Sequence, residues 1–216
     1  MWLGAGIGYY RSGNPIAAEA CLNESNVCNP LNPRTWAFLA LLCMRTNPEQ
    51  VGMLFEQTQR HGLSDAVLWA ELGCEMLITI NKPTWSLKCL QRALSGKAIP
   101  HRGTIHTDEA EETPSSSPAP RDLNQGEGIT IDDSKSTEAL GSIRNVSGND
   151  TYTSGTMQGS SVLPPSMTNI CLYYLSHALL RLNRVEEARK ALTRVIRDST
   201  NDVLKAKAEV DLKHCV

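Results

Sequence analysis

The sequence predicts an all-α fold, an array of antiparallel helical hairpins that is interrupted by a disordered acidic loop. Two observations lead to this prediction. Trp2, Trp36 and Trp69 lie 34 and 33 residues apart, and each is followed three positions later by an aliphatic residue or Ala and then by Gly or Ala. A repeat of this length is typical of stacked helical hairpins. Between residues 104 and 165, by contrast, the composition changes to one that cannot build a core.

The three Trp phrases match the start of the tetratricopeptide consensus, and over about 150 residues the chain resembles the tetratricopeptide repeat family. The resemblance implies a right-handed superhelix in which the two helices of each hairpin approach closely at small residues. With the Trp register kept, and a one-residue insertion near Asn81, these positions are Gly6, Ala40, Gly73 and Ser176 on the first helices, and Ala18, Gly52, Ser86 and Ala188 on the second helices. All eight are Gly, Ala or Ser, as close packing requires.

Local signals predict where the helices begin. Asn-Pro pairs at 14–15, 32–33 and 47–48 each mark a helix start, because Pro is favoured at the first position of a helix. Apolar periodicity then predicts four hairpins and a final capping helix with a polar outer face. The predicted ranges are 2–12 with 15–28, 33–45 with 48–61, 65–80 with 83–94, 167–182 with 185–198, and 201–214.

Residues 104–165 separate the third hairpin from the fourth. They hold ten acidic and three basic residues, and 29 of these 62 residues are Ser, Thr, Gly or Pro. Such a segment cannot bury enough apolar surface to offset the entropy of ordering it. We therefore expect three hairpins in residues 1–103, a disordered insertion in 104–165, and a fourth hairpin with the capping helix in 166–216. The insertion is either a regulatory element or a passive spacer.

Composition excludes several functional classes. The net charge of -2 does not indicate a nucleic-acid-binding protein. The longest apolar runs, 36–44 and 76–80, are far shorter than the roughly 20 residues of a membrane span, and the N-terminus does not resemble a secretory signal. Seven cysteines without a Cys-x-x-Cys spacing indicate buried filler residues in a reducing, cytoplasmic environment.

No pattern in the chain predicts catalysis, a metal site or a cofactor. The glycine run at residues 4–8 has no preceding strand, so helix packing explains it better than a phosphate site. The histidines lack the spacing of metal ligands. Cys171 and His177 are six residues apart and therefore lie on different faces of a helix, which does not favour a thiol enzyme. We expect a non-enzymatic protein.

The tetratricopeptide resemblance implies that the first helices line a concave groove that binds other proteins. Most of the side chains on this face are apolar, which favours an apolar helix or extended peptide as the ligand, either from a partner or from another stretch of the same chain. No nucleic acid or membrane partner is expected. The predicted groove residues are Tyr10, Arg11, Arg34, Leu41, Met44, Arg45, Leu77, Tyr173, His177 and Arg181.

Arg11, Arg45 and Arg181 occupy equivalent positions near the ends of three first helices. Two interpretations are open. The arginines form a basic row for an acidic partner, which includes the acidic insertion itself, or they are cations that the helix dipole favours at a C-terminus.

A narrower resemblance lies between residues 22 and 76. The phrase from Leu22 to Asn26, the run from Trp36 to Cys43, and Leu63-Ser64-Asp65 with Glu71 resemble the C-terminal repeats of the cilia- and flagella-associated protein 70 family. This resemblance implies a docking scaffold on the ciliary or flagellar axoneme that supports dynein-driven motility. The alternative is a cytosolic adaptor, unrelated to cilia, that the acidic insertion regulates. Because a repeat starts directly at Met1, the sequence also suggests either a truncated gene model or a fragment of a longer protein.

Overall fold

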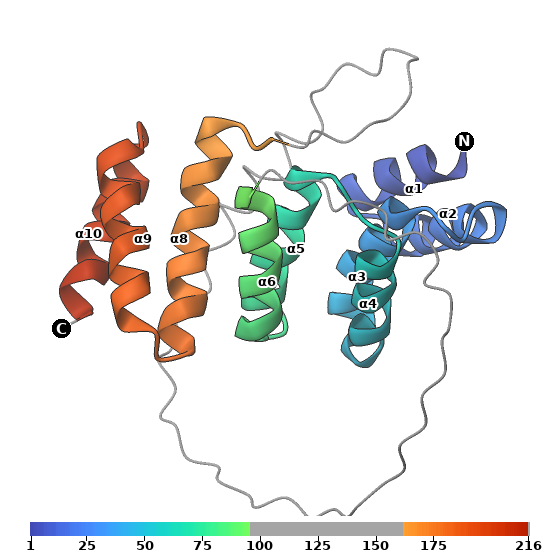
Figure 1. The fold of residues 1–216 in the computed structure, drawn as a ribbon. Helices are drawn as coiled ribbons and strands as arrows, with labels where there is room; N and C mark the ends of the chain where they lie inside the picture. The colour runs from blue at the N-terminus through green and yellow to red at the C-terminus, as the bar shows by residue number, and fades with distance from the viewer. Residues whose placement is uncertain (96–161, 216) are drawn as a thin grey trace, which may run out of the picture.

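The computed structural model of this chain describes residues 1–95 and 162–215. In these residues, pairs of helices follow one another in a row (Figure 1). These residues contain helices and no strand. The pairs are α1 (Trp2–Arg11) with α2 (Pro15–Cys28), α3 (Pro33–Thr46) with α4 (Val51–Arg60), α5 (Ala66–Ile78) with α6 (Pro83–Ser95), and α8 (Pro165–Arg181) with α9 (Val185–Asp198), followed by α10 (Asp202–His214). The predicted tetratricopeptide-like array of hairpins is confirmed.

α2 and α3 begin at Pro15 and Pro33, as the Asn-Pro pairs predicted. The side-chain oxygens of Asn14 and Asn32 accept hydrogen bonds from backbone N–H groups in the first turns of α2 and α3, and Asp65 and Asn201 do the same for α5 and α10. The prediction of one helix over 48–61 is wrong in its first turn. There Asn47 makes no side-chain cap, and a 3-10 helix, η1 (Pro48–Gln50), precedes α4.

Glycines permit the close helix contacts predicted within the hairpins. A Cβ atom at Gly6 would lie 2.8 Å from the Leu22 side chain on α2, and a Cβ at Gly73 would lie 2.7 Å from Leu90 on α6. Both distances are shorter than real carbon contacts, so a larger residue would force the facing leucine side chain or its helix to shift. Seven of the eight predicted small positions are buried, and Gly52 is partly exposed against Trp85. The small residues therefore set the spacing of each pair.

The fourth hairpin continues the array, because α8 packs directly against α6 and α5. Its start was predicted two residues too late, since α8 begins at Pro165. Leu163, which the sequence assigned to the insertion, is buried in the main core, so the packed part of the chain resumes before the helix itself. The remainder of the predicted insertion, 104–161, and residues 96–103 lie outside the described residues.

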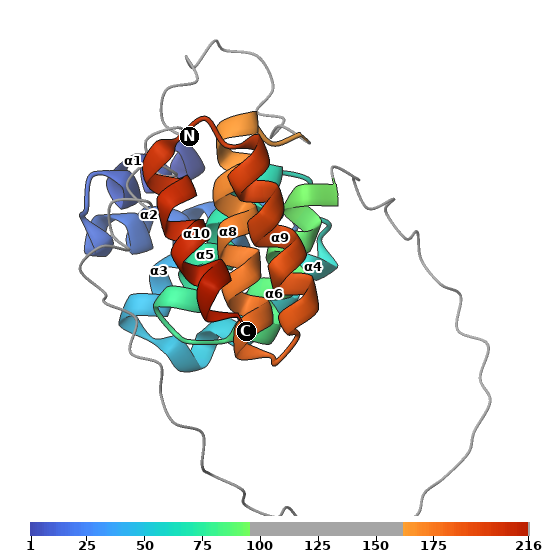
Figure 2. The same ribbon diagram turned by 90° about the vertical axis from the view of Figure 1, so that its left-hand side faces the viewer.

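The last helix, α10, lies beside α8 and α9 at the C-terminal end of the row (Figure 2). Leu204 and Ala208 point into a small second core with Leu172, Leu192 and Val195. The predicted polar outer face is only partly correct. Val203 and Val210 are 66% and 52% exposed, because the buried positions of α10 turn these neighbours toward solvent.

Candidate protein-binding face

The first helices were predicted to line an apolar groove, but several of those side chains are in the core. Leu41, Met44 and Leu77 are only 1%, 1% and 2% exposed, so the expectation that they are available to a partner is wrong. The reason is that α5 is enclosed: from Ala66 to Leu77 every residue except Val67 is buried, and α3, α6 and α8 pack around this helix.

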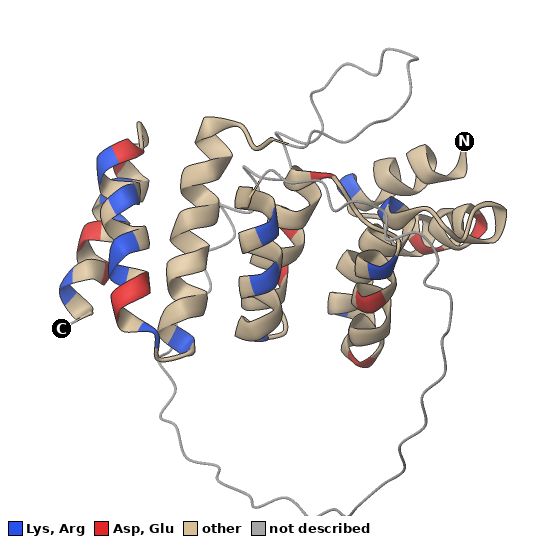
Figure 3. Ribbon diagram, viewed as in Figure 1, with Lys and Arg blue, Asp and Glu red and all other residues tan. Residues whose placement is uncertain are grey.

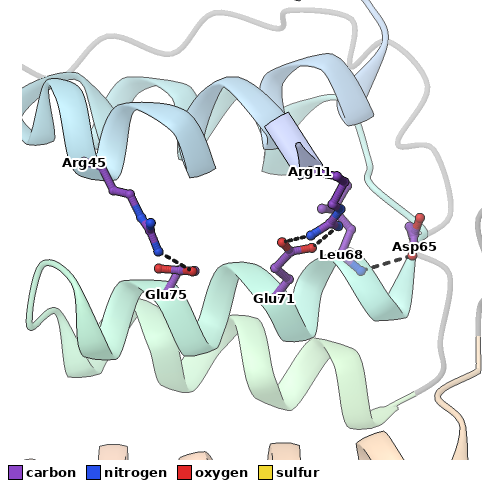
Figure 4. A network of polar contacts seen from close by, with 6 residues as sticks. All are labelled: Arg11, Arg45, Asp65, Leu68, Glu71 and Glu75. Carbon is purple, nitrogen blue, oxygen red and sulfur yellow. Dashed lines mark hydrogen bonds and ion pairs between the residues drawn. The ribbon is translucent and has the colours of Figure 1, made fainter. Parts of the chain in front are cut away.

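Two buried glutamates on α5 are the main polar feature of this face (Figure 4). Glu71 and Glu75 are 0% and 1% exposed, which would be costly for a carboxylate without partners. Figure 4 shows both side chains pointing toward arginines of preceding hairpins, Arg11 from α1 and Arg45 from α3. The two charges therefore hold first helices of different hairpins together.

Arg11 forms the tighter of the two pairs. Its two terminal nitrogens each donate a hydrogen bond of 2.5 Å to one carboxylate oxygen of Glu71. This two-bond geometry is the strongest arrangement between an arginine and a carboxylate. The guanidinium also lies 5.3 Å and 5.7 Å from the ring centres of Tyr10 and Phe38, where the aromatic faces attract a cation. Arg11 is thus enclosed by partners on several sides.

Arg45 is bound more loosely. One terminal nitrogen lies 3.2 Å from an oxygen of Glu75, and the Arg45 side chain is 53% exposed. The second oxygen of Glu75 accepts a hydrogen bond of 2.8 Å from the Thr79 hydroxyl. Glu75 therefore keeps a partner when Arg45 moves, and half of the arginine surface remains available to solvent or to another protein.

The other two predicted arginines also have internal partners. Arg34 lies 3.4 Å from the carboxylate of Asp65, the residue that caps α5. Arg181 donates hydrogen bonds to the backbone carbonyl of Leu77 and to the side-chain oxygen of Asn81. Each of these contacts joins a first helix to a neighbouring hairpin or its turn.

A second polar cluster lies between α8 and α10. The Nε2 atom of His177 is 3.2 Å from a carboxylate oxygen of Asp211, an ion-pair distance at which the two atoms do not align as a hydrogen bond. The Tyr173 ring stands edge-on to His177, with centres 4.6 Å apart. Burial raises the pKa of Tyr173, and so does the neighbouring carboxylate of Asp211.

Asp211 is ionised more readily than an ordinary aspartate. Burial raises the pKa of Asp211. The nearby His177 and Tyr173 lower the pKa by more than burial raises it, so the net pKa lies below the usual 3.8. The carboxylate therefore stays charged on the partly exposed boundary between α8 and α10. Here the predicted groove residues Tyr173 and His177 are in contact with the chain's own last helix.

Glu71, Glu75 and Asp211 were not among the residues predicted for this face. The two glutamates had a signal in the sequence, since they are the only charged residues of an otherwise apolar helix and lie four positions apart on one side of it. Acids at such positions indicate buried partners of opposite charge. The alternatives considered for Arg11 and Arg45 therefore omitted the actual partners, which are acids of the same chain.

The described residues contain few side chains that could bind a metal ion or act as a nucleophile. In residues 1–95 and 162–215 no group of three His, Cys, Asp or Glu side chains could hold a metal ion. Burial raises the pKa of Cys171 to about 12, which keeps this thiol protonated and a poor nucleophile. Five of the seven cysteines are buried as expected, whereas Cys21 is partly exposed and Cys28 is exposed. Over the same ranges, the helices are all too short or too polar to span a bilayer.

Comparisons with known proteins identify the family. A family model described as the Cilia and flagella-associated protein 70 C-terminal domain matches residues 1–113, which include α1 to α6. Curated proteins named Cilia- and flagella-associated protein 70 from Macaca fascicularis and Homo sapiens are each 35% identical over 72 residues. These matches cover 33% of this chain but only 7% and 6% of the relatives' length. No solved structure matches. Since the family model spans more than half of the sequence, the chain belongs to the family of the cilia and flagella-associated protein 70 C-terminal domain.

Proposed function

We propose that the chain is a non-catalytic interaction scaffold of cilia or flagella, docked on the axoneme, where it supports dynein-driven motility. The observation that carries this proposal is the family match over residues 1–113, together with the ciliary name of the curated relatives. Arrays of helical hairpins bind proteins through side chains on helix faces, and one fold serves many partners in this way. An array of helical hairpins whose relatives carry a ciliary name is best suited to connecting other proteins.

The partner is a helix or extended peptide that lies across the first helices of the array. The apolar side chains predicted for this role are partly withdrawn into the core, so the partner contacts the side chains that keep some exposure. The predicted residues that keep some exposure are the following: Tyr10, Arg11, Arg34, Arg45, Tyr173, His177 and Arg181. Arg45 is the main charged contact because half of its side chain is exposed beside Glu75.

The test follows the chain in ciliated cells that lack the endogenous protein. We expect the tagged chain to remain in axonemes after detergent extraction and to restore beat frequency. The Arg45→Gln variant should reduce retention, because it removes a cation from the contact face while Glu75 keeps its bond from Thr79. Arg194→Gln on α9 is the matched control, since it also removes an exposed arginine that is paired with a carboxylate.

Circular dichroism of the purified variants establishes that both remain helical. Complete extraction of the wild-type chain by detergent, with no effect on beating, would contradict the ciliary proposal. Retention of the wild type with equal retention of Arg45→Gln would instead contradict the assignment of the contact face.

A further inference from the structure

The second helix of the third hairpin carries a row of positive charge. The row runs along one side of α6, starting at the residue before it, with spacings of three, three and four, and consists of Lys82, Trp85, Lys88 and Arg92. Lys82 and Lys88 are exposed, and the other two residues are partly exposed. α6 itself contains no Asp or Glu. We call these four residues the α6 basic stripe.

The second helix of the fourth hairpin, α9, neutralises its cations within the helix. Four arginines in or next to α9 each lie between 2.7 and 3.5 Å from a nearby carboxylate: Arg184, Arg189, Arg194 and Arg197. None of the ion pairs among residues 1–95 and 162–215 involves a cation of the α6 basic stripe. Figure 3 shows the contrast, with blue but no red on α6 and both colours on α9. The positive charge of α6 is therefore not balanced on its own helix.

Indole rings hold two of these cations in place. The guanidinium of Arg92 lies 4.9 Å from the ring centre of Trp69, and the Lys82 ammonium lies 6.0 Å from that of Trp85. The Nη1 atom of Arg92 is shielded from water and has no hydrogen-bond acceptor among the described residues. A shielded donor without an acceptor is unfavourable, so a carboxylate from elsewhere would stabilise this side chain.

The sequence supplies carboxylates shortly after α6. Residues 108–112 contain four acids in five positions: Asp108, Glu109, Glu111 and Glu112. The connection from Ser95 at the end of α6 is residues 96–107, which is twelve residues. A chain of this length spans up to about 40 Å, whereas the helix from Lys82 to Ser95 is about 20 Å long. The acidic run is therefore within reach of every cation of the stripe.

We propose that the α6 basic stripe binds the acidic run 108–112 of the same chain. Three cations then face four carboxylates, and Lys88 and Arg92 are the main contacts because they lie one turn apart near the end of α6 that leads to the run. A short connection gives its ligand an effective concentration in the millimolar range, so weak ion pairs are sufficient. The family match ends at residue 113 and includes this run but not the later acids of the segment.

This contact is independent of the proposed ciliary role. It uses a second helix, whereas the face proposed for the partner is on the first helices. Failure of one proposal therefore leaves the other unaffected.

Carbodiimide cross-linking of the full 216-residue chain, read by mass spectrometry, tests the contact. This reagent joins a lysine ammonium to a carboxylate only where the two groups meet. We expect Lys88 to be linked to the run 108–112 within one molecule, and the link to disappear in 1 M salt, where the screening length falls to about 3 Å. Arg92→Gln should lower the yield of this link about threefold, because it removes the neighbouring cation. Arg194→Gln on α9 is the matched control and should leave the yield unchanged.

Backbone amide NMR signals of α6 provide a second measurement. Neutralising all four acids of the run, each Asp to Asn and each Glu to Gln, should shift the signals of residues 85–92 to their positions in high salt. The matched control removes the same charge later in the segment and should leave these signals in place: Glu127→Gln, Asp132→Asn, Asp133→Asn and Glu138→Gln. Circular dichroism of each variant establishes that it remains helical.

Three results would overturn the proposal. In the first, Lys88 is linked to Glu56 of α4 and not to the run. In the second, a mixture of 14N- and 15N-labelled chains shows links only between different molecules, which would assign the stripe to a second copy. In the third, the two sets of neutralised acids shift the α6 signals equally or not at all, which would show that no specific contact exists.

Discussion

The first three hairpins and the C-terminal part of the array connect their first helices in different ways. Across α1, α3 and α5 the connections are buried ion pairs, Arg11 with Glu71 and Arg45 with Glu75. Between α8 and α10 the connection is the partly exposed contact of His177 with Asp211. The same role in the repeat is thus filled by fully buried carboxylates in one region and by a partly exposed pair of side chains in the other.

This difference determines how strongly each region depends on its polar residues. A buried carboxylate without its arginine retains the full cost of desolvation, whereas a carboxylate near the surface is stabilised by water. The family match ends at residue 113 and therefore includes both buried pairs but not the α8–α10 cluster. We expect substitutions to have graded effects on the free energy of unfolding, largest at α5 and smallest on α9.

Arg11→Ala should have the largest effect. It removes both hydrogen bonds to the fully buried Glu71 and should lower the free energy of unfolding by about 3 kcal/mol, measured by urea denaturation. The double variant Arg11→Leu with Glu71→Leu should recover much of this loss, because it leaves no buried charge behind. An equal loss in both variants would show that packing rather than charge is responsible.

Gly73→Ala compares the tight contact of the third hairpin with that of the fourth. Its Cβ would lie 2.7 Å from Leu90, so overpacking should cost about 2 kcal/mol. Ser176 occupies the same position of α8 and already accommodates a larger side chain, so Ser176→Ala should cost less. Urea denaturation of both variants measures the difference, and a larger loss for Ser176→Ala would contradict the equivalence of the two sites.

Arg45→Ala separates the two buried pairs from each other. The expected loss is about 1 kcal/mol, smaller than for Arg11→Ala, because Arg45 is half-exposed and Glu75 retains its hydrogen bond from Thr79. Combining Arg45→Ala with Thr79→Val should enlarge the effect beyond the sum of the two single losses. If the two single losses simply add in this double-mutant cycle, the idea that Arg45 and Thr79 together stabilise the Glu75 carboxylate is contradicted.

Asp211→Asn tests the C-terminal cluster and its pH dependence. Because the folded state lowers the pKa of Asp211 below 3.8, its charged form stabilises the fold at higher pH, and this contribution is lost as the pH falls below that value. The variant should therefore be less stable than the wild type by about 0.5 kcal/mol at pH 6, with a difference that narrows at pH 3. Urea denaturation at both pH values measures it, and a difference that grows toward low pH would contradict the assignment.

Arg189→Ala should have the smallest effect. Its pair with Glu186 on α9 is 3.5 Å long, and the two side chains are 44% and 78% exposed, so the loss should stay below about 0.5 kcal/mol. A loss as large as that of Arg45→Ala would remove the distinction between the buried and exposed regions. Urea denaturation under the same conditions provides the comparison.

Local signals in the sequence were sufficient for most of the fold. The Asn-Pro pairs at 14–15 and 32–33 placed the starts of α2 and α3, because the preference of Pro for the first helical position depends only on neighbouring backbone groups. The repeat of Trp and small residues identified the hairpins, since helix spacing depends on side-chain size at a few positions. Leu163 was missed because its burial depends on contacts with distant helices rather than on its neighbours in the sequence.

The candidate site was predicted less well for the same reason. Leu41, Met44 and Leu77 were assigned to a face by their position in the repeat, but their exposure depends on how closely neighbouring first helices approach. The partners of Arg11 and Arg45 are 60 and 30 residues away in the chain, and the charge pattern of one hairpin does not determine such distances.

By itself, the sequence determined that this protein is an array of helical hairpins, because repeat spacing, helix-start signals and small-residue positions are local properties. The resemblance of residues 22–76 added the relation to ciliary proteins. Only the tertiary structure decided which arginine meets which glutamate, and that α5 is enclosed. Burial and ion pairing result from the summed geometry of several helices, and small changes in packing decide which side chains reach water.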